Sequence, residues 1–179
     1  LANTKITAIV TQPTTARTLA VGVSATFNVG ATDPAVISVT VTYPEVTLQG
    51  ALESGVLTIS KVIETFVPGT VLDLPHEPVI DAFAFSYDKP KDYLTVSMNM
   101  TMQGWEFTFP FAQDPLFSLD RVGFGVTRDK GTNTGNITAS TTMVPSFTPQ
   151  IKVDVGAYYE ASKNWRFMAR TTTVVPLND

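Results

Sequence analysis

Apolar residues recur at every second position along much of this chain. In the stretch TLAVGVSATFNV, residues 18–29, hydroxyl and amide side chains fall mostly between apolar ones, which are Leu19, Val21, Val23, Ala25, Phe27 and Val29. Because successive side chains of a strand point to opposite faces, this spacing predicts a strand with one buried face.

The same alternation is found in several later segments. It is strong at 37–43, 94–102, 105–111 and 151–159, and weaker near 56–67, 82–87, 121–127, 136–144 and 165–174. Helical spacing is not convincing over any stretch of about a dozen residues. Turn residues separate the segments at 67–70, 87–92 and 128–136, and the last of these predicts a hairpin loop.

About ten half-buried strands without a substantial helix predict an all-β fold. The expected architecture is a two-sheet antiparallel β-sandwich, of the jelly-roll or immunoglobulin-like kind, and a sheet closed on itself is the alternative. Because there is no internal repeat or change of composition, residues 18–179 are expected to form a single domain. Residues 1–17 are expected to form an N-terminal strand and a stiff linker rich in Thr and Pro.

One stretch is similar to a known kind of module. Residues 12–34, QPTTARTLAVGVSATFNVGATDP, resemble the opening strands of bacterial and animal immunoglobulin-like modules. The Cys pair and the Trp on the third strand that such modules often carry are absent here. The resemblance implies a sandwich and transfers no function.

Composition excludes some classes of function. Only 16% of the residues are charged, against about 25% in an average soluble domain, and threonine is abundant, which favours an extracellular or cell-surface protein. The net charge of −4 argues against nucleic-acid binding, which requires clustered Lys and Arg. The chain has no cysteine for disulfides or thiolate metal sites, and no apolar run long enough to predict a membrane span.

The densest polar cluster is DLPHEPVID, residues 73–81, which contains the only histidine. His76 is a candidate general base, but a lone histidine between two prolines in a connection is typically solvated, so we expect no catalytic residue and no enzyme. Calcium, which prefers oxygen ligands, is a candidate bound ion. Its candidate ligands are Asp73, Glu77, Asp81, Asp129 and Asn133, although ordinary turn chemistry also explains these residue types.

Aromatic residues and sequons suggest sites for sugars. Residues 104–111, GWEFTFPF, place aromatic side chains on one face of a strand, either as core or as a platform for sugar rings. Trp165 is the better candidate for an exposed glycan contact. Asn99 and Asn136 each begin an N-x-[ST] sequon, and Asn136 lies beside the predicted hairpin loop.

The N-terminal strand offers a further hypothesis. Ile6, Ala8 and Val10 share one face of residues 4–10, and the stiff stretch that follows separates this strand from the next one. Either the strand belongs to the same sheet system, or it docks into a neighbouring subunit and completes the neighbour's sheet. A head-to-tail contact of the second kind does not close, so it grows a fibre.

The sequence therefore favours a structural subunit of an extracellular fibre or surface assembly, with other copies of itself as partners. A lectin-like carbohydrate-binding sandwich is the alternative, with a glycan as its partner. An enzyme with an internal cavity is a third class, in which Met98, Met100 and Met102 would line the pocket, although ordinary core is the simpler interpretation of these residues.

Overall fold

The computed structural model describes most of the chain, in the ranges 2–11, 18–67, 74, 76–108, 110–111, 113–143, 150–161 and 163–173. Some sequence predictions fall on residues outside these ranges: the linker at 12–17, most of the turn at 67–70, the calcium candidate Asp73, the ring of Phe109, and the last residue of each strand predicted near 136–144 and 165–174.

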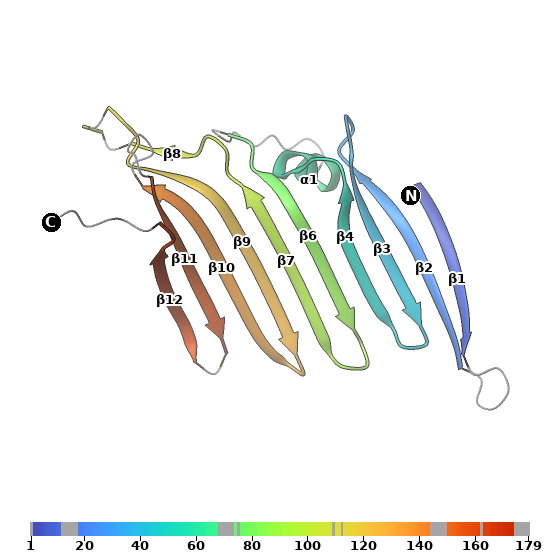
Figure 1. Ribbon diagram of the computed structural model, residues 1–179. Helices are drawn as coiled ribbons and strands as arrows, with labels where there is room; N and C mark the ends of the chain where they lie inside the picture. The colour runs from blue at the N-terminus through green and yellow to red at the C-terminus, as the bar shows by residue number, and fades with distance from the viewer. Residues whose placement is uncertain are drawn as a thin grey trace.

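The described strands form one open antiparallel sheet, seen in Figure 1. The path across it is β1-β2-β3-β4-β6-β7-β9-β10-β11-β12, so that nearly every strand lies beside its neighbour in sequence. The bounds are β1 Ala2–Thr11, β2 Thr18–Val29, β3 Ala35–Tyr43, β4 Thr47–Ser54, β6 Val79–Asp88, β7 Tyr93–Thr101, β9 Phe117–Asp129, β10 Thr132–Met143, β11 Ile151–Glu160 and β12 Asn164–Thr171. Two short strands lie off this path: β5 (Leu57–Thr58) pairs with β6, and β8 (Glu106–Phe107) pairs with β9.

The predicted all-β class is confirmed. The predicted packing of two sheets is not confirmed, because the pairings join every strand of the described residues into a single sheet. The hairpin predicted at 128–136 is confirmed as the turn between β9 and β10, where Lys130 and Gly131 have φ values of 48° and 81°. Two successive residues with positive φ are typical of the two-residue turns that match the twist of a hairpin.

The register places most of the apolar residues of these strands on the same side of the sheet. One row runs Phe83, Met98, Phe124, Ile137, Ala157 and Phe167 across β6, β7, β9, β10, β11 and β12. Residues directly opposite in an antiparallel pair point to the same face, so the row marks one continuous surface. We call this side the apolar face. The other side, the hydroxyl face, carries Ser24, Thr40, Gln49, Ser86, Thr95 and similar polar residues.

The compact part of the molecule lies at one end of the apolar face. Val29, Ala35, Leu57 and Ile80 form a buried cluster there, against which Met98 and Met100 pack, so the interpretation of these methionines as core is confirmed. A short helix, α1 (Ile59–Phe66), covers this end, at the top of the sheet in Figure 1. Among the described residues only one other hydrophobic side chain, that of Met102, is buried.

The strand predicted near 56–67 is wrong for most of its length, because residues 59–66 form α1. The Thr58 hydroxyl caps the helix by accepting a hydrogen bond from the Lys61 amide at 3.2 Å. The Lys61 ammonium donates to the carbonyl oxygens of Asp33 and Val56 at 2.6 and 2.8 Å. The helix is thereby fastened to the loop between β2 and β3.

The aromatic strand predicted at 105–111 is also wrong in part. Only Glu106 and Phe107 are paired, after a turn in which Gly104 has a φ of 80°. The Phe107 ring stacks on Phe117 at 4.7 Å, while Phe111 is 100% exposed. These side chains therefore do not share one buried face.

Candidate functional site

The sheet ends in two strands that each have a partner on one side only. Among the described residues β1 pairs with β2 alone, and β12 pairs with β11 alone. Their outer edges carry backbone N–H and C=O groups without a ladder partner, and these groups form a template for another strand. Because neighbours alternate in direction along the ten-strand path, β1 and β12 run antiparallel to each other.

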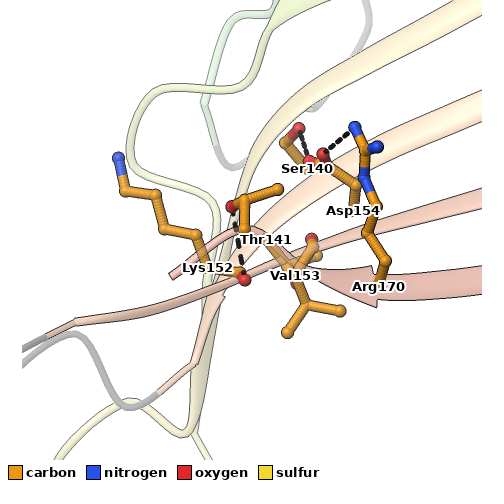
Figure 2. A network of polar contacts seen from close by, with 7 residues as sticks. Ser140, Thr141, Lys152, Val153, Asp154 and Arg170 are labelled. Atoms are coloured by element: carbon orange, nitrogen blue, oxygen red, sulfur yellow. Dashed lines mark hydrogen bonds and ion pairs between the residues drawn. The ribbon is translucent and has the colours of Figure 1, made fainter. Parts of the chain in front are cut away.

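Charged side chains often protect edge strands, but the two arginines of β12 form ion pairs with the neighbouring strand β11. The Arg170 guanidinium lies 3.6 Å from the Asp154 carboxylate of β11, and Asp154 also accepts a 2.6 Å hydrogen bond from Ser140 of β10. Figure 2 shows this chain of contacts across the three strands. Arg166 lies 3.7 Å from the Glu160 carboxylate in the same way. These pairs hold β12 to the sheet and direct its charges toward β11 rather than toward the open edge.

The apolar face is largely open to solvent. Its exposed members include Ile6 and Phe167, which are 71% and 78% exposed, and several residues of the intervening strands: Val23, Phe27, Val41, Tyr43, Phe124, Ile137, Val155 and Trp165. The whole chain exposes 12439 Å², whereas a compact monomer of its mass exposes about 8,500 Å². The exposed residues named above show that this fold leaves apolar surface that a compact domain would cover.

A shallow apolar hollow of about 480 Å³ lies over β10, β11 and β12. The apolar-face side chains that line it are Ile137, Ala139, Val155, Ala157, Phe167 and Ala169. It lies on the half of the face away from α1 (Figure 1).

The hydroxyl face carries a polar cluster near the start of β9. The Asp120 carboxylate accepts hydrogen bonds from Ser118 at 2.8 Å and from the buried Thr142 at 2.6 Å. Asp120 lies where the register of β9 and β10 shifts, so it is a bulge residue. These two hydrogen bonds hold the Asp120 side chain in place at the bulge.

Glu77 anchors the start of α1. Its carboxylate accepts hydrogen bonds from the Ser60 amide at 2.8 Å and from the Ser60 hydroxyl at 2.6 Å. Partial burial raises the pKa of Glu77, but the hydrogen bonds from Ser60 and from the Thr58 hydroxyl outweigh it, so the pKa lies below its ordinary value. A carboxylate at a helix N-terminus is also favoured by the helix dipole.

Replacement of Glu77 is expected to weaken this anchor in a pH-dependent way. Because the folded-state pKa is lowered, the ionised carboxylate stabilises the fold above its unfolded-state pKa, and the effect is lost as the pH falls through the folded-state pKa. We expect Glu77→Gln to lower the free energy of unfolding by about 1 kcal/mol at neutral pH, and to match the wild type in acid. Urea titrations at several pH values measure this, with the exposed Glu64→Gln as the control. A cost for Glu77→Gln that does not change with pH would contradict the assignment.

The four calcium candidates within the described residues lie in two separate places, Glu77 and Asp81 before and in β6, and Asp129 and Asn133 at the hairpin between β9 and β10. The Glu77 carboxylate binds Ser60, and that of Asp81 accepts a 2.5 Å hydrogen bond from Thr101. Asp129 and Asn133 lie at the hairpin between β9 and β10, where the Asn133 carbonyl oxygen accepts a hydrogen bond from Ala161. Within the described ranges no group of three or more His, Cys, Asp or Glu residues could hold a metal ion.

The other candidate residues lie apart from one another. His76 is exposed, and its ring packs against Gly104. Asn99 is exposed in the middle of β7, so its sequon lies within a strand. Asn136 is half-buried inside β10, between Gly125 and Tyr158, rather than in the loop that precedes it, because β10 begins at Thr132. Its side chain folds over Gly125, which has no side chain to obstruct it.

Trp165 belongs to an aromatic group on the apolar face. Its ring lies 5.3 Å from Tyr159 and 6.3 Å from Phe167, and it is 48% exposed. The exposure predicted for Trp165 is thus found, and glycan contact stays a prediction. The N-terminal strand pairs with its own chain, with Ile6 opposite Val23, Ala8 opposite Val21 and Val10 opposite Leu19.

No protein-family model, curated protein or solved structure matches this chain. In the part of the chain that the structure describes, no helix has the length and apolar character needed to cross a membrane.

Proposed function

We propose that this chain is a structural subunit of an extracellular or cell-surface assembly, in which the N-terminal strand joins each copy to the next. The observation that carries the proposal is the pair of unlike free edges, β1 and β12, at opposite ends of one sheet. When β12 of one copy pairs with β1 of another, the alternation of strand directions continues without interruption. Such a contact is heterologous, so it adds subunits indefinitely unless the rotation between neighbouring copies closes a ring.

The charges on the edges distinguish between two registers of this pairing. Pairing Ala8 with Ala169 places Val10 opposite Phe167 and Thr7 opposite Arg170, all within the bounds of β1 and β12. Lys5 then faces a position two residues beyond Arg170. A shift of the register by two residues would place Lys5 directly opposite Arg170, and these like charges would destabilise the pairing of the two strands. In this register the apolar face of each copy continues into that of the next.

Cysteine cross-linking tests the joint, because the chain has no cysteine of its own. We expect oxidation to give a ladder of covalent multimers for Ala8→Cys combined with Ala169→Cys, or for Thr7→Cys combined with Arg170→Cys. Successive residue pairs alternate between Cα separations of about 5.5 and 4.5 Å, so one of the two combinations has the better disulfide geometry.

The single-cysteine variants are the controls, since each can yield no more than a covalent dimer. A cross-link within one chain is excluded by distance, because nine strand spacings of about 4.8 Å separate the two edges. If neither double variant exceeds the dimers of the controls, edge-to-edge assembly is wrong.

A further inference from the structure

The size of the apolar face argues that something covers it. Ten strands lie about 4.8 Å apart, and eight residues of a strand span about 26 Å, so the face measures about 1,100 Å². The largest apolar patch on an ordinary monomer is about 300–600 Å². Helix α1 already covers one end of this face, so an interface that buries the open remainder on two partners removes at most about 2,200 Å², which leaves room for a stable interface of standard size.

The chemistry of the face suits another apolar protein surface. Along the paired strands that the structure describes, Arg128 is the one formally charged side chain on this side, and it lies at the margin near the hairpin between β9 and β10. Large rings such as Phe83 and Phe124 share the face with small residues such as Ala139 and Ala157. Two sheets that pack face to face interdigitate large and small side chains in this way.

The shape of the apolar face suits a second copy of this chain in particular. Helix α1 lies near β4 and β6 and the hollow lies over β10, β11 and β12, so β7 and β9 separate the two in the strand order (Figure 1). In a two-fold contact, a projection on one side of the axis meets the surface an equal distance away on the other side. A two-fold axis near β7 and β9 would therefore place α1 of each copy over the hollow of the other.

We propose that two copies of this chain pack through their apolar faces and form a two-sheet sandwich between molecules. Each copy supplies one sheet, and the hydroxyl faces remain outside. The sandwich architecture that the sequence predicts within one chain is thus completed by a second chain. This contact is independent of the edge-to-edge joint, and it goes beyond that joint by converting a single-layer ribbon into a double-layer one.

The test compares a charge placed on each face. Ile137→Lys introduces a lysine on the apolar face in the lining of the hollow, and Ser97→Lys introduces one at an exposed position of the hydroxyl face nearby. An unpaired charge buried on both copies is expected to raise the dissociation constant of the pair by at least about a hundredfold, whereas Ser97→Lys should leave it unchanged. Sedimentation equilibrium measures the constant, and binding of an apolar fluorescent dye reports whether the face is open.

The outcomes separate this proposal from the edge-to-edge joint. Face pairing is supported if Ile137→Lys dissociates the pairs and binds the dye while the cysteine ladder persists in the same background. It is overturned if both lysine variants associate like the wild type, or if the wild-type chain binds the dye strongly at every concentration. Flotation of wild-type chain with phosphatidylcholine vesicles would also overturn it, because lipid rather than a second copy would then cover the face. Loss of the disulfide-linked multimers alone would count against the edge-to-edge joint and not against the face-to-face pairing.

Discussion

Deletion of residues 1–12 abolishes elongation while the remainder of the chain stays folded: this is the largest effect that we expect. In the described residues β1 pairs with β2 alone, so its removal leaves the other pairings and the buried cluster around Leu57 intact. It leaves β2 as the edge, and β2 runs parallel to β12. The next subunit would then have to join through a parallel pair, which is less stable and breaks the alternation of the sheet.

Light scattering during assembly measures the effect, and a peptide of residues 1–12 provides the matched rescue. Added to the truncated protein, the peptide is expected to pair with β2 and restore growth. Circular dichroism typical of β-sheet in the truncated protein excludes simple unfolding. Elongation of the truncated protein at the wild-type rate would contradict the role of β1.

Leu57→Ala is expected to have the largest effect on stability. Leu57 is 2% exposed at the centre of the buried cluster, and it lies between β6 and the start of α1. Truncation of a buried leucine leaves a cavity and costs about 3 kcal/mol. This loss is a large part of the total free energy of unfolding, because the described part of the chain has few buried hydrophobic side chains to compensate for it.

The neighbouring residue supplies the control. Val56 is also aliphatic but is exposed, so Val56→Ala should change the free energy of unfolding by less than about 0.5 kcal/mol. Urea denaturation of both variants at low protein concentration gives the comparison. Equal costs for the two substitutions would mean that the cluster around Leu57 does not stabilise the fold.

The two-residue alternation was sufficient to predict most of the strands and the residues that share their faces. It also contains a signal for the bulge at Asp120, because the apolar positions Phe117 and Leu119 are followed by Val122, Phe124 and Val126, a shift of one residue. Helix α1 is short, but Ile59, Val62, Ile63 and Phe66 have helical spacing after the capping Thr58, and that signal could have located it.

The alternation does not predict what covers the apolar face. The alternation indicates that one side of each strand is apolar. The pattern is the same whether the sheet that covers this side comes from the same chain or from another molecule. The inward-leaning arginines of β12 were equally hidden, because the pairs of Arg170 with Asp154 and of Arg166 with Glu160 depend on which strand lies beside β12. The aromatic run at 105–111 misled because strand pairing ends at Phe107 and residues 110–111 lie in a turn, although the alternation of apolar residues continues.

Negative-stain electron microscopy of the full-length protein tests the central claim most directly. Free edges at both ends of the sheet and an uncovered apolar face predict long ribbons, two sheets thick. A field of separate particles, each the size of one chain at every concentration, would contradict the account.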